Sequence, residues 1–350
     1  MFARRRNNRI VLVIGLALMV AVAILLFKVL PTYNKLFRAN VHRNIPTGFL
    51  LYVPTGATFS DVMDSLIYHD VLMDTTSFRF AARFHKYDDN VKAGRFPVKP
   101  GMSNRDLIVS LRSANVPVRL VINKKRAVDD FVDYIAPKFE FTDTALADLL
   151  SDDFFLRAKG FNRANALTIF VPNTYEVWWN ITAEAFCERM HREYNNFWNK
   201  QRMSQAEAVG LTPEQVITLA SIVEEETNFD DEKPRVAGLY LNRLNRGMLL
   251  QADPTLKFAH NNFELQRVLN RHKQIESPYN TYKYTGLPPG PIGIPAISSI
   301  EAVLNREVHD YLFMCAKADF SGYHAFAKTH EQHLRNAAGY QAELNRRGIR

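Results

Sequence analysis

The segment TPEQVITLASIVEEET, at residues 212–227, carries a clear helix pattern. A capping Thr212, a proline at the first helical position and a glutamine three residues after the cap form a strong helix start. At about 100° per residue, the apolar face centres near Val216 and Val223. The pattern predicts a helix that packs one face against a core and ends in consecutive glutamates.

The three glutamates differ in their position around this helix. Glu225 lies roughly opposite the apolar face and is predicted to be solvated, while Glu224 and Glu226 lie at the two borders of that face. Ala220 and Ile217 precede Glu224 by one and two turns, an apolar setting that favours the protonated form of a carboxyl group. A general acid needs that form. Periodicity alone does not separate Glu224 from Glu226.

Length and composition limit the function classes. A chain of 350 residues has room for an anchor and two or three modules, and 47% apolar residues with 24 Phe and 14 Tyr indicate packed structure throughout. The net charge of +8 attracts any polyanion without choosing among them. Because the basic residues form no stripe interleaved with aromatics, and no phosphate-loop or zinc-finger spacing occurs, nucleic-acid binding is not expected.

An uncharged apolar run extends from Ile10 to Phe27, close to the length that a helix needs to cross a bilayer. A signal peptide is the alternative, but its apolar region is usually shorter and ends at small residues. Four arginines precede the run and fewer basic residues follow it closely, which predicts a cytoplasmic N-terminus. We therefore expect a basic tail over 1–9, a retained transmembrane helix over 10–30, and an exported remainder.

Two similar phrases occur within residues 48–113, and each reads as strand, turn and helix. The first is VPTGATF at 53–59 and the second is FPVKPGMS at 96–103, with Pro and Gly supplying the turns. Thr58 and Ser103 are predicted N-caps. This segment is predicted to be a small α/β module that binds rather than catalyses.

The next segment predicts a strand over 116–122 and helices over 127–135 and 143–155. The basic triplet 124–126 between them is expected to be a solvated turn, with a contact to polymer carboxylates as the alternative.

Two pairs of residues each leave two interpretations open. Trp178 and Trp179 would either stack on sugar rings or pack in a core or at a membrane interface. Cys187 and Cys315 are too few for a disulfide scaffold or a four-cysteine metal site, and are expected to be free thiols unless they form one bridge.

Further motifs follow the glutamate helix in a fixed order: VAGLYLNRL at 236–244, MLLQADPT at 248–255, SPYNTY at 277–282, GLPPGPI at 286–292 and GYHAF at 322–326. Together with LASIVE at 219–224, this set resembles the endolytic murein transglycosylase family, the YceG-like lytic transglycosylases. The resemblance covers the chain from anchor to C-terminus, because that family also has one N-terminal span and a small lysin-motif-like module before its catalytic domain.

The resemblance implies an α+β fold, with a lysin-motif-like module over 48–113 and a mixed α+β catalytic domain over 114–350. It places the essential glutamate at Glu224. It also implies cleavage of the MurNAc–GlcNAc bond of nascent peptidoglycan strands, with 1,6-anhydromuramoyl ends and limited strand length as the result. The implied setting is the periplasmic side of the cytoplasmic membrane, with glycan strands, membrane lipid and peptidoglycan synthases as partners.

Several residues are candidates for substrate contacts. Gln251 and Asp253 would orient the substrate, although Asp253 before Pro254 is also suited to capping a helix. His324 would contact substrate or lie in the core. The remaining candidates carry hydroxyl or amide groups suited to sugar and acetamido contacts, or else form a structural turn: Ser277, Tyr279, Asn280 and Thr281.

No cofactor and no metal are expected, since His324, His330 and His333 have no carboxylate or thiol beside them that completes a ligand pattern. The chain departs from the family at Asn173 and Ala252, where the family usually has Asp and Thr. A neutral Asn173 weakens any acid/base role for that position.

Two rival functions remain. In a conventional hydrolase, Glu224 would pair with Asp253 and activate a water molecule. In a non-catalytic scaffold of the wall-synthesis machinery, the module at 48–113 would bind peptidoglycan without cutting it.

Overall fold

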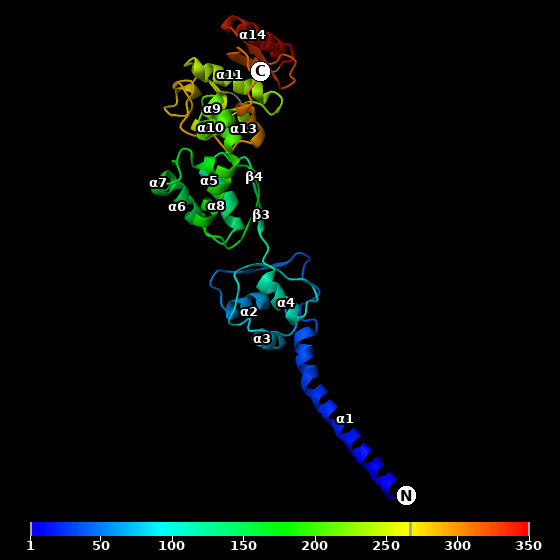
Figure 1. Ribbon diagram of the computed structural model, residues 1–350. Coiled ribbons are helices and arrows are strands. Elements are labelled where there is room, and N and C mark those ends of the chain that lie inside the picture. Colours follow the sequence, from blue (N-terminus) through cyan, green and yellow to red (C-terminus); the bar gives the residue numbers. More distant parts are fainter. Residues whose placement is uncertain (1, 266–267, 349–350) are drawn as a thin grey trace. The chain divides into compact units, whose positions relative to one another are not determined.

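The computed structural model describes residues 2–265 and 268–348, and the chain divides into two compact units. Unit 1 is Met1–Val118 with Trp178–Asn180, and unit 2 is Arg119–Val177 with Ile181–Arg350. Figure 1 shows the order of the elements along the chain. Helices and short strands alternate in both units, in agreement with the α+β prediction.

Unit 1 begins with helix α1 (Phe2–Phe37), which continues through Pro31 and past the predicted end at residue 30. Its segment Ile14–Phe37 is long and apolar enough to cross a membrane. The last turn of α1 is part of unit 1 itself, because Leu36 is buried in the core of that unit.

The rest of unit 1 contains β1 (Leu50–Val53), α2 (Phe59–Tyr68), α3 (Thr75–Phe84), β2 (Gly94–Pro97) and α4 (Asn104–Ser113). Strands β1 and β2 pair antiparallel and form a two-stranded sheet. Both predicted strand–turn–helix phrases are therefore confirmed, whereas α3 was not predicted. The lysin-motif-like character of residues 48–113 stays a prediction.

The predicted helix caps of unit 1 are confirmed. Thr58 accepts a hydrogen bond from the backbone N–H of Asp61, and Ser103 accepts one from Asp106. Apolar residues that recur at helical spacing in α2 and α4 are buried in one core: Val62, Leu66, Leu107 and Leu111. Within unit 1, Trp179 packs edge-on against Tyr52, with ring centroids 5.0 Å apart, while Trp178 is exposed.

The first part of unit 2 consists of β3 (Val118–Ile122), α5 (Val128–Ile135), a 3₁₀ turn (Ala136–Lys138), α6 (Asp143–Ser151), α7 (Asp153–Arg157), a second 3₁₀ turn (Ala166–Ile169), β4 (Asn173–Val177) and α8 (Ala183–Phe197). Strand β3 pairs with β4. Asn173 is exposed at the start of β4, and Cys187 is a buried free thiol in α8.

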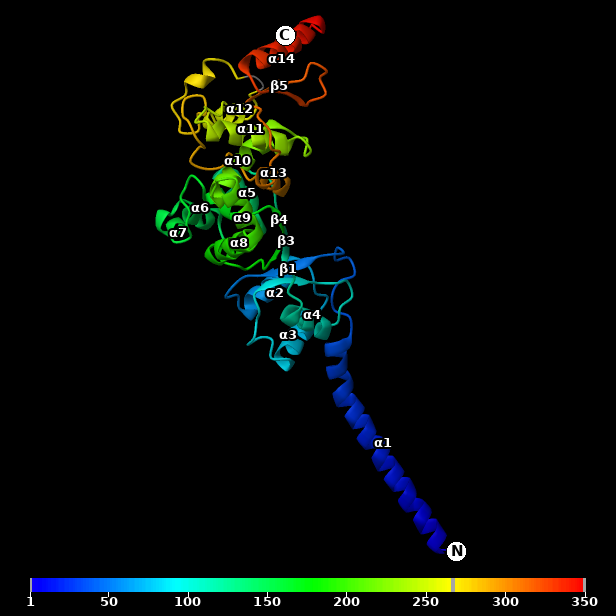
Figure 2. The same ribbon diagram turned by 45° about the horizontal axis from the view of Figure 1, so that its top comes forward.

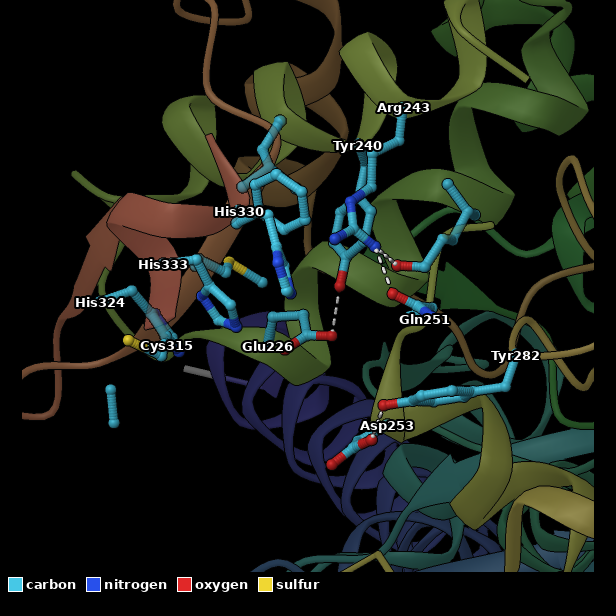
Figure 3. Close-up of a pocket in the computed structure, with 15 residues that line it drawn as sticks. Glu226, Tyr240, Arg243, Gln251, Asp253, Tyr282, Cys315, His324, His330 and His333 are labelled. Carbon is cyan, nitrogen blue, oxygen red and sulfur yellow. Dashed lines mark hydrogen bonds between the residues drawn. The ribbon is translucent and has the colours of Figure 1, made fainter. Parts of the chain in front are cut away.

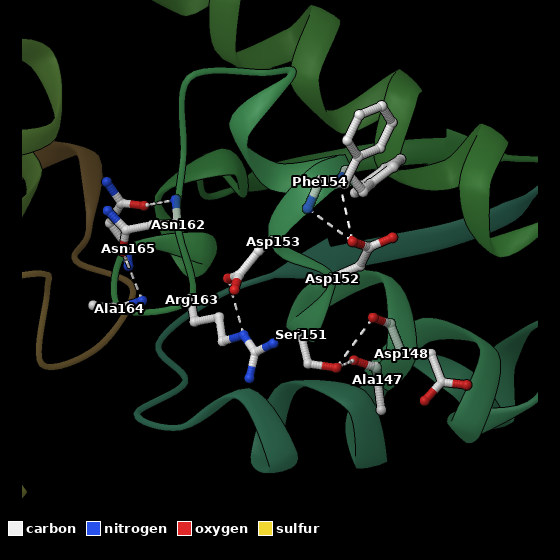
Figure 4. Close-up of polar contacts among 11 residues, drawn as sticks. Ala147, Asp148, Ser151, Asp152, Asp153, Phe154, Asn162, Arg163, Ala164 and Asn165 are labelled. Carbon is white, nitrogen blue, oxygen red and sulfur yellow. Dashed lines mark hydrogen bonds and ion pairs between the residues drawn. The ribbon is translucent and has the colours of Figure 1, made fainter.

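The predicted helix at 143–155 is interrupted at Asp152, which separates α6 from α7 (Figure 4). The Asp152 carboxylate accepts a hydrogen bond from the backbone N–H of Phe154 at 2.8 Å, and so acts as the cap of α7. The Ser151 hydroxyl donates to the carbonyl of Ala147 at 2.9 Å at the end of α6. Apolar periodicity continues across this junction, which is why the pattern predicted one helix.

The second part of unit 2 contains α9 (Lys200–Ala208), α10 (Pro213–Glu226), α11 (Lys233–Asn245), α12 (Asp253–Ala259), a 3₁₀ turn (His272–Gln274), α13 (Ile297–Leu304), β5 (Phe313–Ala316), β6 (His324–Ala327) and α14 (His330–Arg346). Strands β5 and β6 pair antiparallel, and α14 packs on them. Cys315 in β5 is also a free thiol.

Helix α10 is the centre of this part and contacts α9, α11, α12 and α13. Its predicted start is confirmed, because Thr212 and Gln215 form a capping box around Pro213. Every residue from Val216 to Val223 is buried, not only those on one face. The middle of the helix is therefore enclosed, and only its first turn and its C-terminal glutamates reach partly or fully exposed positions.

Candidate active site

The C-terminal end of α10 opens into a cavity of about 340 Å³ (Figure 3). Its lining combines the end of α10, the middle of α11, the loop before α12, and the β5–β6 hairpin with the start of α14. The polar residues that line it are Glu226, Tyr240, Arg243, Gln251, Asp253, Tyr282, Cys315, His324, His330 and His333.

Glu226 is the last residue of α10 and faces this cavity. The hydroxyl of the buried Tyr240 on α11 donates a hydrogen bond to Glu226 Oε1 at 2.5 Å. Burial, aided by the negative charge of Asp253, raises the pKa of Glu226 to about 7, although the Tyr240 hydrogen bond and nearby His324 oppose the rise. Glu226 is therefore poised to give up or take a proton near neutral pH.

Arg243 lies one turn after Tyr240 and fixes the cavity wall beside it. Its Nε donates to the carbonyl of Leu312 at 2.6 Å, and Nη1 donates to the carbonyl of Leu250 at 2.8 Å and to Gln251 Oε1 at 3.3 Å. Gln251 has a positive φ of 53°, a conformation that is uncommon for a residue other than glycine. The buried guanidinium thus holds Gln251 at the cavity.

Asp253 lines the cavity as a second carboxyl group, and Tyr282 donates its hydroxyl to Asp253 Oδ1 at 2.5 Å. Helix α12 begins at Asp253, but its N-cap is Ala252, without a side-chain hydrogen bond. The alternative that Asp253 caps this helix is therefore wrong.

His324 at the start of β6 forms the opposite wall together with His330 and His333. Its backbone N–H and Nδ1 contact the two oxygens of the buried Glu232 carboxylate at 2.7 and 2.9 Å. Although burial lowers it, the hydrogen bond to Glu232 raises the pKa of His324. Across residues 2–265 and 268–348, no group of three or more His, Cys, Asp or Glu side chains is arranged to hold a metal ion.

Glu224, the predicted acid/base, is not among the residues that line this cavity. Its Oε2 lies 3.0 Å from the ammonium of the buried Lys233 on α11 and accepts a hydrogen bond from Ser299 on α13. Lys233 also contacts Asp230 at 2.8 Å. Although burial lowers it, the hydrogen bonds to Asp230 and Glu224 raise the pKa of Lys233. The predicted apolar setting of Glu224 is wrong, because Lys233 and Ser299 come from helices that the α10 pattern does not describe.

Glu225 is not free in solvent, so that prediction is also wrong. Lys124 contacts Glu225 at 2.8 Å, and Arg126 donates to both of its oxygens at 3.1 and 3.2 Å. Burial raises the pKa of Glu225, but these hydrogen bonds outweigh it and lower the pKa. Two residues of the basic triplet, Lys124 and Arg126, thus pair with α10, and the prediction of a solvated turn is wrong.

The candidate sugar contacts at 277–281 form a turn beside the cavity and do not line it. Asn280 is buried, donates to the carbonyls of Lys273 and Ile275, and accepts from the backbone N–H of Tyr282 at 3.0 Å. Thr281 accepts from the backbone N–H of Ala252 at 3.0 Å. These bonds position Tyr282 and the loop before α12.

The other two residues of this turn bond within it and to the preceding part of unit 2. The Ser277 hydroxyl accepts from the backbone N–H of Tyr279, and the Tyr279 hydroxyl donates to the carbonyl of Ala164 at 3.3 Å. Of the predicted substrate contacts, only Gln251, Asp253 and His324 line the cavity.

Sequence reasoning missed Tyr240, Arg243, Tyr282 and Glu232. The first two lie three residues apart in VAGLYLNRL, a spacing that puts both on one face of a helix. This shared helix face is the signal in the sequence that points to both residues. The partner of Glu232 is remote in sequence and could not be read from a local pattern.

The chain matches a family model described as the YceG-like family over residues 51–339. It is 26% identical over 337 residues to the endolytic murein transglycosylase of Bacillus subtilis, covering 89% of this chain and 90% of that protein. It is also 26% identical over 325 residues to the endolytic murein transglycosylase of Streptococcus pneumoniae D39, covering 84% of this chain and 58% of that protein.

A crystal structure of a yceG-like protein from Listeria monocytogenes is similar as well, with a TM-score of 0.56 and 26% sequence identity, covering 83% of this chain and 98% of that chain. Since the family model spans most of its length, this chain belongs to the YceG-like family.

Proposed function

We propose that this protein is a lytic transglycosylase that cleaves peptidoglycan glycan strands, with Glu226 as its acid/base. The observation that carries the proposal is the carboxyl group of Glu226, which faces the cavity, accepts the Tyr240 hydroxyl and has a pKa raised to about 7 by burial. The names of the curated relatives support the same activity.

One carboxyl group can serve both halves of this reaction. Protonated Glu226 would donate its proton to the glycosidic oxygen, and the resulting carboxylate would accept the proton of the C6 hydroxyl of the muramoyl residue. That hydroxyl would then close a 1,6-anhydro ring, so that no attacking water is needed. Tyr240 would stabilise the carboxylate between the two steps by the hydrogen bond that it already donates.

Glu224 stays the assignment implied by the sequence resemblance, and a direct comparison decides between the two residues. Replacing Glu226 by Gln should reduce the cleavage rate by about a hundredfold or more, because the amide cannot cycle a proton. Glu225→Gln is the matched control, since Glu225 lies between them and pairs with Lys124 and Arg126 away from the cavity lining. An inactive Glu224→Gln variant that folds normally, beside an active Glu226→Gln variant, would restore Glu224.

A hydrolase is the alternative enzyme, and one feature of the site is compatible with it. Asp253 lines the same cavity and influences the titration of Glu226, so two carboxyl groups face one space. If Asp253 activated a water molecule, the products would carry reducing ends instead of anhydro ends. Mass spectrometry of the glycan ends therefore separates the two reactions. Binding of strands without cleavage would favour the scaffold.

Two further proposals concern the location of the protein in the cell and the length of the glycan strands that it leaves. Helix α1 would anchor the chain in the cytoplasmic membrane with the basic N-terminus inside, and the catalytic domain would work on the periplasmic side. There it would cut the MurNAc–GlcNAc bond of nascent strands beside the synthases and so limit strand length. The module at 48–113 would bind the polymer. Longer strands in cells that carry the Glu226→Gln variant would support this role.

A further inference from the structure

The C-terminal end of α1 is built into unit 1 instead of leading to it through a linker. Leu36 is 5% exposed and lies in the unit's core, and α1 packs against α3 and α4. The Asn104 side chain at the start of α4 donates to the backbone carbonyl of Lys35 at 2.8 Å. The orientation of α1 therefore fixes which face of unit 1 lies closest to a membrane that α1 crosses.

Exposed aromatic and basic side chains lie around the C-terminal end of α1 and on the adjacent helix α3, and together they are here named the aromatic–basic face. The ammonium of Lys35 lies 4.6 Å from the ring centroid of Phe80, and Phe80 stacks on Phe84. Tyr33 stacks on Phe37 at 4.8 Å. Phe84 and Tyr33 are each 58% exposed, and Phe37 is 45% exposed, so each of these three rings is open to solvent.

The two segments that form most of this face carry charge of one sign. Residues 28–38 and 75–84 contain five basic residues and no acidic residue: Lys28, Lys35, Arg38, Arg79 and Arg83. Over the described part of the chain, none of these five forms an ion pair. Their charges are therefore free to meet anions from outside the protein.

The aromatic–basic face begins, along α1, at the outer edge of the headgroup layer of a bilayer. A hydrocarbon core of about 30 Å takes about 20 helical residues, so a span that starts at Ile10 leaves the core near Val29. Each headgroup layer adds roughly 5–7 Å, or about four residues, which reaches Tyr33. Figure 1 and Figure 2 both show α3 at the end of unit 1 from which α1 departs.

We propose that the aromatic–basic face docks unit 1 onto the anionic headgroups of the membrane that α1 crosses. The aromatic rings would lie against the headgroup layer, at the membrane–water interface where such side chains are enriched. The basic residues would contact lipid phosphates, each contributing about fivefold to the preference for an anionic lipid, which equals about 1 kcal/mol. The proposal rests on the proposed membrane anchor.

The test places a photoreactive benzoylphenylalanine at one position at a time in the full chain, reconstituted in nanodiscs of mixed anionic and zwitterionic lipid. Position 84 tests the proposed face. Position 25, inside the apolar run, tests the anchor itself. Position 68 is the matched aromatic control, because Tyr68 is 85% exposed but lies on α2. Mass spectrometry identifies the cross-linked lipids.

We expect lipid adducts at positions 25 and 84 and none above background at position 68. Adducts at 84 should be enriched in anionic lipid relative to the disc composition, and Arg79→Gln with Arg83→Gln should return the ratio to that of the disc. Adducts at 25 without adducts at 84, a covalent protein dimer at 84, or an unenriched ratio would each overturn the proposal. No adduct at 25 would instead overturn the anchor.

Discussion

The hydrogen bond from Tyr240 to Glu226 gives the sharpest test of the proposed acid. Tyr240→Phe removes only the hydroxyl that Glu226 Oε1 accepts at 2.5 Å, and the buried ring remains. A hydrogen bond to a charged group contributes about 1.5–3 kcal/mol, and part of this persists when the carboxyl is protonated. A differential loss of about 1.4 kcal/mol corresponds to one pKa unit. The pKa of Glu226 should therefore rise from about 7 to about 8.

The assay is the pH dependence of kcat/KM for cleavage of isolated glycan strands, because this quantity reports groups of the free enzyme. A required acid makes kcat/KM fall as the pH rises above its pKa, so the falling limb should move from near pH 7 to near pH 8. Tyr279→Phe is the matched control, since the Tyr279 hydroxyl bonds to Ala164 outside the cavity lining. A limb that stays in place or moves to lower pH in a folded Tyr240→Phe protein would refute the reasoning.

Three further outcomes follow from the same geometry. Glu224→Gln should lower the free energy of unfolding by about 1–3 kcal/mol in urea titrations, because it weakens a charged hydrogen bond of the buried Lys233. Cleavage should persist in this variant. An unchanged free energy of unfolding would contradict a structural role for Glu224. Folding raises the pKa of Glu226 from 4.5 to about 7. The stability that its neutral form provides is therefore present below pH 4.5, and up to about 3 kcal/mol of it should be lost as the pH rises to about 7. Glu226→Gln should abolish this loss of stability, and a loss of the same size in the variant would assign it to other groups. Removing residues 1–30 keeps Leu36 in the core and should leave cleavage of isolated strands intact, so inactivity with a normal thermal transition would show that α1 contributes to the site.

Local signals in the sequence predicted local structure well. The capping box at Thr212 and the caps Thr58 and Ser103 depend on residues within three positions of each other, and all three are present as expected. The apolar run predicted the long N-terminal helix, although not its continuation through Pro31. Helix α3 was missed because it shows no repeat of the strand–turn–helix phrase that marked its neighbours.

The candidate site could be predicted only in part, because its polar contacts connect residues far apart in the chain. Gln251, Asp253 and His324 were predicted to contact substrate, and all three line the cavity. The turn at 277–281 has the hydroxyl and amide groups of a sugar site, but those groups bond to the protein itself. Residue type alone does not say whether a polar group is already satisfied.

Helical periodicity cannot predict which of Glu224 and Glu226 is the acid/base. A helical pattern separates a buried face from a solvated one, but α10 is enclosed by other helices, so no face of its buried turns is solvated. What then distinguishes the two carboxyl groups is the partner that each meets: an ammonium for Glu224 and a phenol for Glu226. The Glu224 carboxylate is held by Lys233 and Ser299 and is not part of the cavity lining, whereas Glu226 faces the cavity and burial raises its pKa to about 7. Only the second arrangement places beside the cavity a group that can both give and take a proton near neutral pH, and this supports the proposal of Glu226 as the acid/base.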